Sequence, residues 1–217
     1  MADLKLYIGN KCFSSWSLRP WMALKMAGIA FVEEVIRLRQ PDTKAKILKV
    51  SPHGKVPLLV HGEVKVWESL AILDYIADAF PQAKLWPADP VARGLARSVA
   101  AEMHGGFADL RNQWGMNLRK PRTHKPLVDA AIAQGARIEA IWEECRAKHG
   151  DGGPFLFGQF TCADAMYAPV VSRFHTYGGE LSPVTQAYCD AMLATPAMRE
   201  WFSDAAKESW PEPDPFE

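Results

Sequence analysis

Hydrophobic and polar positions follow two different rhythms along the chain, and the first of them occupies residues 1–80. Apolar and polar residues alternate in Leu4–Ile8, which predicts a strand. Helical spacing follows over residues 17–27 and closes at Gly28, the residue type most often found at a left-handed helix C-cap. A second β-rich run over residues 31–36 predicts another strand.

The same alternation of elements continues to residue 80. A short helix is expected over residues 42–50, where Pro41-Asp42 provides a start signal. Residues 56–60 and 64–66 flank a glycine-containing turn and predict a hairpin. A helix then begins at Ser69, and its apolar positions are four residues apart: Ile72, Ile76 and Phe80. The predicted order is strand–helix–strand, then helix–strand–strand–helix.

The second rhythm begins after the proline-rich residues 81–90, which are predicted to be a linker. Strand signals end there, and five helical stretches follow, over residues 91–116, 127–148, 161–176, 183–194 and 196–207. The proline-rich residues 211–215 are expected to cross the surface in extended form. The fold class predicted is therefore an α/β domain over residues 1–80 followed by an all-helical domain over residues 91–217.

Composition narrows the class of protein further. The 217 residues include 25 Lys+Arg and 25 Asp+Glu, so the basic excess of a nucleic-acid-binding protein is absent. We find neither a secretion signal nor a run of about 18 apolar residues that would span a membrane. The four cysteines have neither metal-ligand nor CxxC spacing: Cys12, Cys145, Cys162 and Cys189. We therefore expect a soluble cytoplasmic protein with reduced thiols, without metal, nucleic-acid or membrane partners.

The first candidate motif is a serine-rich segment at the start of the first predicted helix, which contains Ser14, Ser15 and Ser17. A hydroxyl there can donate a hydrogen bond to an anion, while the backbone N–H groups and the helix dipole add positive potential. Such an environment suits a ligand thiolate. The alternative is ordinary N-capping by serine, and the segment taken alone favours that interpretation.

The second motif is the Val56-Pro57 step that enters a predicted strand. A cis bond at this step would turn the N–H and C=O of Val56 outward, where a peptide ligand can pair with them as an added strand. The alternative is a trans proline at the first residue of a strand. Local sequence favours the trans form, because only about 5–6% of X-Pro bonds are cis.

The third motif is Glu68-Ser69, directly before an apolar helix. Glu68 could pair with an ammonium group, while Ser69 and the free helix N–H groups could receive a carboxylate. This pattern matches both ends of an amino-acid zwitterion. The alternative is an ordinary N-cap preceded by a solvated acid, which Glu68-Ser69 taken alone favours.

The fourth motif is structural. Thr161 and Asp164 have the spacing of a capping box, with Asp in place of the usual Glu or Gln. We expect this pair to start a helix in the interior of the second domain.

Taken together in this order, the four motifs resemble the cytosolic glutathione transferase family over essentially the whole chain. The resemblance implies a thioredoxin-like domain that binds glutathione, followed by a helical domain that shapes the pocket for a second substrate. Around the first helix the chain is most similar to the serine-type zeta and tau classes and to bacterial members. Ser14, Ser15 and Arg19 match the zeta pattern Ser-Ser-Cys-x-Trp-Arg, whereas Trp16 and Leu18 depart from it. The departure argues against a zeta-type isomerase activity.

The resemblance also implies roles for individual residues. Ser14 is the donor to the glutathione sulfur and Ser15 the alternate, while Tyr7 near the end of the first strand ranks below both. Cys12 keeps a thiol-transferase activity open. Glutathione is held by Lys55 at its glycine carboxylate (with His53 a further candidate), by the Val56 backbone and Pro57 at its cysteinyl part, and by Glu68 and Ser69 at its γ-glutamyl end.

The second-substrate pocket is predicted on the helix over residues 91–116, where several side chains share one face: Met103, His104, Phe107, Arg111 and Trp114. The alternative is that Met103, Phe107 and Trp114 belong to the core, and that His104 is a satisfied interior histidine. Helical spacing does not choose between these interpretations.

The function expected from these observations is transfer of the glutathione thiolate to a small apolar electrophile, as in detoxification, without a metal. The alternatives are a glutathione-dependent isomerase, peroxidase or dehalogenase, or a non-catalytic binding or regulatory module. The resemblance further implies a homodimer in which the α/β domain of one chain packs against the helical domain of the other.

Overall fold

The computed structural model describes residues 4–209. The proline-rich segment at 211–215 that we expected to be extended lies outside these residues. A four-stranded sheet with the order β2-β1-β3-β4 forms the first half of the molecule. Strand β1 (Leu4–Ile8) pairs in parallel with β2 (Val32–Val35) and antiparallel with β3 (Leu58–His61), which pairs antiparallel with β4 (Val64–Trp67).

Alternation along β1 has the predicted consequence. Leu4, Leu6 and Ile8 are buried while Lys5 and Tyr7 are half-buried, because successive side chains of a strand point to opposite faces. Leu6 lies opposite the buried Leu59 of β3. The sheet thus directs its apolar side chains into the core.

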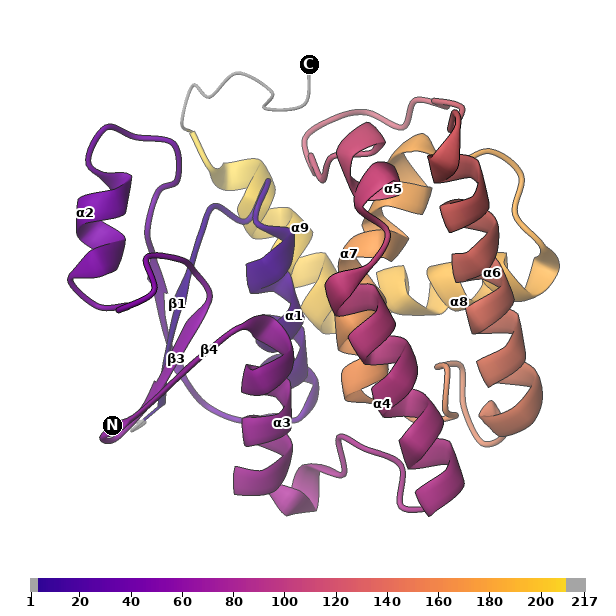
Figure 1. Ribbon diagram of the computed structural model, residues 1–217, viewed down its shortest axis with the longest axis horizontal. Helices are drawn as coiled ribbons and strands as arrows, with labels where there is room; N and C mark the ends of the chain where they lie inside the picture. The colour runs from indigo at the N-terminus through magenta and orange to yellow at the C-terminus, as the bar shows by residue number, and fades with distance from the viewer. Residues whose placement is uncertain (1–3, 210–217) are drawn as a thin grey trace.

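Helices cover the sheet on both sides (Figure 1). Helices α1 (Ser15–Met26) and α3 (Ser69–Ala79) lie on the side that faces the rest of the molecule, and the short α2 (Thr43–Leu48) lies on the other. In α1 every residue from 17 to 24 is buried, which is the pattern of a helix packed on two sides. Helix α2 buries only Ile47.

Apart from isolated β-bridges at residues 155–159, the regular secondary structure of the second half is helical among the described residues. After the 3₁₀ turn Pro81–Ala83 come six helices: α4 (Pro90–Gly105), α5 (Ala108–Gln113), α6 (Ala130–His149), α7 (Cys162–Tyr177), α8 (Pro183–Ala194) and α9 (Pro196–Lys207). The bounds of α8 and α9 are those predicted. The fold class predicted from the sequence, a thioredoxin-like domain followed by a helical domain, is confirmed.

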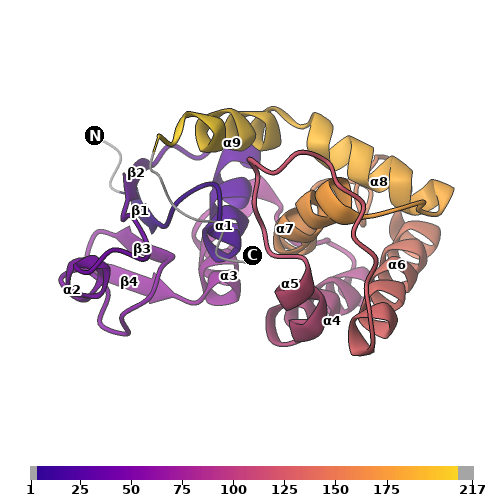
Figure 2. The same ribbon diagram turned by 90° about the horizontal axis from the view of Figure 1, so that it is seen from above.

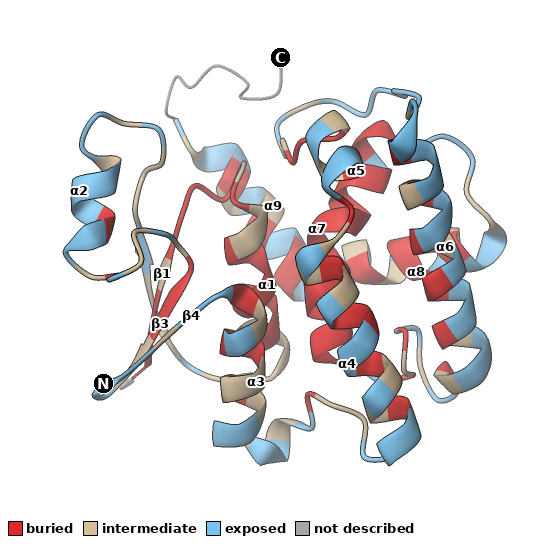
Figure 3. Ribbon diagram, in the orientation of Figure 1, coloured by how far each residue is buried: buried red, intermediate tan, exposed pale blue. Residues whose placement is uncertain are grey.

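Helix α7 is the centre of the molecule. All of its residues except His175 are buried, and Figure 3 shows it as a buried column surrounded by more exposed helices. Its neighbour α1 lies between α7 and the sheet, so that one apolar core continues from the strands into the helical half. Seen from above, α9 runs beside α1 and α8 covers the helical half (Figure 2).

The prediction of one helix over residues 91–116 is wrong. Helix α4 ends at Gly105, Gly106 is extended, and Phe107 adopts a left-handed conformation with φ of 60° before α5 begins. Two consecutive glycines make this point the weakest in the helical pattern. In addition, a Cβ on Gly106 would approach the carbonyl oxygen of Glu102 to 2.7 Å, so this turn depends on glycine. None of the helices between residues 4 and 209 is long and apolar enough to cross a lipid bilayer.

Candidate active site

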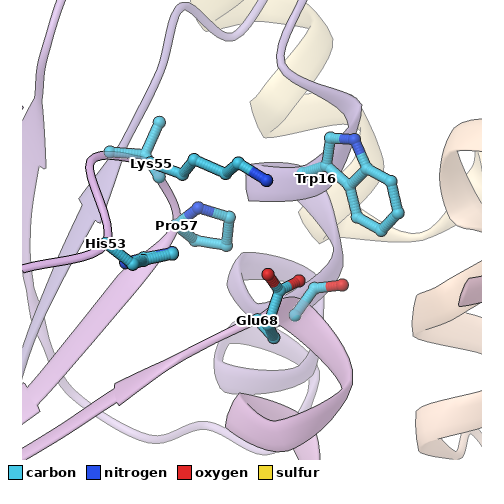
Figure 4. Close-up of a pocket in the computed structure, with 7 residues that line it drawn as sticks. Trp16, His53, Lys55, Pro57 and Glu68 are labelled. Atoms are coloured by element: carbon cyan, nitrogen blue, oxygen red, sulfur yellow. The ribbon is translucent and has the colours of Figure 1, made fainter. Parts of the chain in front are cut away.

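One cavity of about 230 Å³ opens beside the ends of β3 and α3. Seven residues line it: Trp16, His53, Lys55, Val56, Pro57, Glu68 and Ser69. All five residues expected to hold glutathione are among them. Figure 4 shows Trp16 on one side of the cavity, and His53, Lys55 and Pro57 on the other, with Glu68 between them.

The loop before β3 supplies one wall. Ser51 is fully buried, and its hydroxyl lies 2.7 Å from His53 Nδ1 and donates to the carbonyl oxygen of Lys55 at 2.9 Å. These two bonds hold the loop so that the exposed Lys55 side chain extends toward Trp16. The Val56–Pro57 peptide bond is cis, although local sequence favoured trans.

The turn from β4 into α3 supplies the floor. Glu68 has φ of 65° and ψ of 125°, a conformation that L-residues rarely adopt. Its carboxylate remains about half exposed and lies 3.6 Å from His104 Nε2. Ser69 is the first residue of α3 and is buried, and neither residue caps the helix with its side chain. The alternative of ordinary N-capping is therefore wrong for Glu68-Ser69.

The predicted sulfur donors lie beside the cavity and do not line it. Ser14 precedes α1, and its buried hydroxyl lies 2.8 Å from Ser17 Oγ, which accepts a hydrogen bond from Gly9 N at 3.1 Å. Ser15, the first residue of α1, is half-buried. The side chain of Ser14 makes no cap hydrogen bond, so the alternative of ordinary N-capping is wrong here as well.

Sequence reasoning assigned no role to Trp16, which forms the other wall. Its ring meets the His104 ring edge-on at a centroid distance of 5.3 Å. The guanidinium carbon of Arg19 lies 4.1 Å from the ring centroid of Trp16 and that of Arg111 lies 5.1 Å from it. The only sequence signal was the departure from the zeta pattern, where cysteine stands in this position.

The five residues predicted to form the second-substrate pocket divide into two groups. Met103, Phe107 and Trp114 are buried in the core, so the core interpretation is right for them. His104 and Arg111 instead reach Trp16 beside the cavity. Burial, aided by the positive charges of Arg19 and Arg111, lowers the pKa of His104, while Glu68 acts in the opposite direction.

Two other residues considered as catalysts lie away from the cavity walls. Tyr7 is half-buried on β1, with the Lys5 ammonium 5.6 Å from its ring centroid. Cys12 is fully buried, and its thiol donates to Asn117 Oδ1 at 3.3 Å. Burial raises the pKa of Cys12, which disfavours the thiolate that a nucleophile requires.

The capping box at the start of α7 is confirmed. Asp164 accepts hydrogen bonds from the backbone N–H and hydroxyl of Thr161, both at 2.8 Å, and from Leu156 N at 3.0 Å. Burial raises the pKa of Asp164 to about 6, while these hydrogen bonds act to lower it. Within residues 4–209, no three His, Cys, Asp or Glu side chains come together as metal ligands would.

Comparison with known proteins identifies the family. The sequence model of the glutathione S-transferase N-terminal domain matches residues 13–79, and that of the glutathione S-transferase C-terminal domain matches residues 125–204. The chain belongs to the glutathione S-transferase family. In this transferase, the residues that match the N-terminal model include all seven that line the cavity. The residues that match the C-terminal model include helices α6 to α8 and most of α9.

Relatives of this transferase cover most of its length. A glutathione S-transferase from Triticum aestivum is 26% identical over 92% of this chain and 93% of its own. A probable maleylacetoacetate isomerase from Caenorhabditis elegans is 26% identical over 84% of this chain and 85% of its own.

Solved structures share the same fold. The tau-class glutathione S-transferase from mango superposes with a TM-score of 0.72 at 21% identity, with 94% of each chain covered. A glutathione transferase homologue from Burkholderia, solved with bound glutathione, superposes with a TM-score of 0.64 at 22% identity, covering 94% of this chain and 98% of its own.

Proposed function

We propose that this transferase binds glutathione in the cavity between Trp16 and Lys55 and transfers its thiolate to a small electrophilic substrate. The observation that carries the proposal is the convergence of Lys55, Val56, Pro57, Glu68 and Ser69 on one cavity. These residues come from two separate turns, and the sequence predicts a glutathione contact for each of them.

The charges around the cavity match those of the tripeptide. Glutathione carries two carboxylates, one ammonium group and a thiol. Lys55 offers a cation to the glycine carboxylate, and Glu68 offers a carboxylate to the ammonium group. Ser69 and the N-terminus of α3 receive the γ-glutamyl carboxylate. The backbone of Val56, beside its cis bond to Pro57, pairs with the cysteinyl part.

We assign Ser14 as the hydrogen-bond donor to the glutathione sulfur, with Ser15 as the alternate. Ser14 Oγ donates to Ser17 Oγ at 2.8 Å, and Ser17 Oγ also accepts from Gly9 N at 3.1 Å. Because a serine hydroxyl rotates about its C–O bond, the Ser14 proton can turn from Ser17 to the sulfur when glutathione binds. The hydroxyl then acts together with the positive end of the α1 dipole to favour the thiolate.

The decisive experiment measures glutathione affinity by calorimetry in matched variants. Glu68→Gln and Lys55→Met each remove one charge from the cavity wall, and we expect each to weaken binding by about ten-fold, as for a lost charge-assisted hydrogen bond of about 1.5 kcal/mol. Glu63→Gln removes an exposed charge in the β3–β4 turn and serves as the control. Unchanged affinity in both cavity variants would contradict the proposal.

A glutathione-dependent isomerase is the second candidate, because a probable maleylacetoacetate isomerase is among the relatives. It uses the same glutathione site and differs only in releasing the thiolate again after rearrangement. Turnover without net consumption of glutathione distinguishes the two reactions.

We further propose that the transferase is a homodimer in the cytoplasm. Large apolar side chains remain exposed on β4 and at the start of α4, including Val64, Trp67 and Val91, and a partner subunit would cover such surface. The four cysteines are all unpaired thiols, as is usual in a reducing compartment. Sedimentation of a monomer at micromolar concentration would contradict the dimer.

A further inference from the structure

Arg19 on α1 is a buried cation, and no acid side chain within residues 4–209 neutralises its charge. Arg19 is 1% exposed to solvent. Its Nε and Nη1 atoms have no hydrogen-bond partner among the described residues. A guanidinium carries five donors and stays protonated in nearly all proteins. Burying such a group without a partner is strongly unfavourable. We therefore expect the guanidinium group of Arg19 to bind an anionic group that comes from outside the chain.

Two further guanidinium groups lie close to Arg19. Arg111 on α5 is half-buried, and its Nη1 also lacks a partner. Arg173 on α7 is buried, but it donates to the carbonyl oxygens of Trp114 at 2.7 Å and Pro169 at 2.9 Å. Arg173 therefore has a structural role, whereas Arg19 and Arg111 keep free donors.

Electrostatics shows that the three groups repel one another. Burial, followed by the charges of Arg173 and Arg111, lowers the pKa of Arg19 well below its ordinary range. Burial and the charge of Arg111 lower the pKa of Arg173 to about 9. No carboxylate within residues 4–209 forms an ion pair with any of the three, and Glu68 lies against His104 instead.

The uncompensated charge lies beside the glutathione cavity. Trp16 lines that cavity. The guanidinium groups of Arg19 and Arg111 also lie against the Trp16 ring, and the His104 ring contacts it edge-on. His104 Nδ1 is a further buried nitrogen that has no hydrogen-bond partner in the described part of the chain. In Figure 4 the ring of Trp16 extends away from Lys55 and His53, toward the helical half. A second substrate that enters between the cavity and the helical half would therefore meet Arg19 and Arg111.

We propose that the second substrate of this transferase carries a carboxylate, which Arg19 and Arg111 bind beside Trp16. The proposal rests on the glutathione site described above and replaces the expectation of a purely apolar electrophile. The ring of Trp16 contacts the apolar body of the substrate, and the two guanidinium groups supply donors that match a carboxylate. The His104 ring lies against the edge of the same tryptophan.

The test uses two electrophiles that differ only in charge, 4-chloro-3,5-dinitrobenzoate and 4-chloro-3,5-dinitrobenzamide. In both, the glutathione thiolate forms a bond to the ring carbon that bears chlorine, and chloride leaves with the bonding electrons. We compare kcat/KM after division by the uncatalysed rate with glutathione. For the unmodified enzyme we expect a preference of at least ten-fold for the benzoate.

Arg111→Met is the main variant, because Arg111 is only half-buried and its loss should not prevent folding. It should reduce kcat/KM for the benzoate at least ten-fold and for the benzamide less than three-fold, with the Kd for glutathione unchanged. Arg97→Met, on the exposed surface of α4, is the matched control and should alter kcat/KM for neither electrophile. Arg19→Met is expected to have the same selective effect where it folds.

Inhibition of the unmodified enzyme by 3,5-dinitrobenzoate and 3,5-dinitrobenzamide gives a measurement that needs no variant. The benzoate should inhibit at least ten-fold more strongly. Equal inhibition and equal turnover of the two electrophiles would overturn the carboxylate subsite while leaving the glutathione site intact. A ten-fold loss of glutathione affinity in Arg111→Met, with the benzoate preference unchanged, would overturn it too, since the arginines would then serve glutathione. Absence of glutathione binding in the unmodified enzyme would instead contradict the proposed function.

Discussion

The ammonium group of Lys11, in the segment between β1 and α1, lies 2.8 Å from the carboxylate of Asp204 on the last helix, α9. Glu33 of β2 adds a second ion pair to Lys11 at 2.9 Å. The Glu208 carboxylate accepts a hydrogen bond from the backbone N–H of Lys11 at 2.6 Å. Trp201 Nε1 donates to the backbone carbonyl oxygen of Lys11 at 2.9 Å. The end of the described chain therefore holds the segment that leads into the serines before α1.

Replacing Lys11 tests this connection. The side chain of Lys11 is 6% exposed and its two partners are 28% and 34% exposed, so the ion pairs lie between the surface and buried cases. We expect Lys11→Met to lower the free energy of unfolding by about 1–3 kcal/mol. Lys148→Met, which breaks a fully exposed pair with Glu144, should change the free energy of unfolding much less, because solvent screens that pair. Urea denaturation measures both, and equal effects would contradict the prediction.

Ser14→Ala tests the donor to the sulfur. A free thiol has a pKa of about 8.5, so only about 3% is thiolate at pH 7. Lowering that pKa by about 2 units requires about 2.7 kcal/mol. A hydrogen bond to a charged acceptor supplies about 1.5–3 kcal/mol and a helix N-terminus about 0.3–1 kcal/mol. Ser14→Ala should therefore raise the pKa of the bound thiol and reduce conjugation at neutral pH about ten-fold or more.

The measurement is thiolate absorbance against pH, together with turnover, in Ser14→Ala, Ser15→Ala and Tyr7→Phe. Glutathione affinity should change little in Ser14→Ala, because Glu68 and Ser69 hold the other end of the tripeptide. Loss of activity in Ser15→Ala or Tyr7→Phe, with Ser14→Ala unchanged, would show that the sulfur has a different partner.

The backbone of Glu68 leads to a prediction about strain. A non-glycine residue at φ of 65° and ψ of 125° is expected to be strained by about 1–3 kcal/mol. Glu68→Ala keeps the strain, whereas Glu68→Gly relieves it, so the glycine variant should be more stable than the alanine variant by about 1–2 kcal/mol. Both should bind glutathione at least about ten-fold more weakly, since the carboxylate is lost. A more stable alanine variant would contradict the strain.

Histidine titration by NMR tests the electrostatics around Trp16. Burial and the charges of Arg19 and Arg111 lower the pKa of His104 below its ordinary value, against the opposing charge of Glu68. Because the folded pKa lies below the unfolded value of about 6.5, the contribution of His104 to stability is present above that value and is lost as pH falls through the folded pKa. His104→Gln assigns the signal.

Arg111→Met should raise the pKa of His104, because a nearby positive charge is removed. Arg97→Met should leave it unchanged. An unchanged pKa in Arg111→Met would mean that Arg111 does not face His104 in solution.

Local signals in the sequence determined the order of the elements and several of their bounds. Helices α8 and α9 begin with proline after Ser182 and Thr195, and both hydroxyls accept the capping hydrogen bonds. Their start signals lie within three residues, where one sequence contains all the interacting groups. The turns at residues 55–57 and 68–69 were recognised from the order of the motifs along the chain and from the family resemblance, because each motif taken alone favoured an ordinary structural role.

Only the tertiary structure decided which face of the helical half meets the cavity. Met103 on α4 and Phe107 at the break after it are buried in the core, whereas His104 on α4 and Arg111 on α5 lie beside Trp16. Helical spacing could not separate these residues, since it describes one uninterrupted helix and not the packing of α4 and α5 against α1 and α7. His104 and Arg111 are distant from Trp16 in the sequence but contact its ring in the structure. Such proximity arises from the packing of the core and not from local sequence.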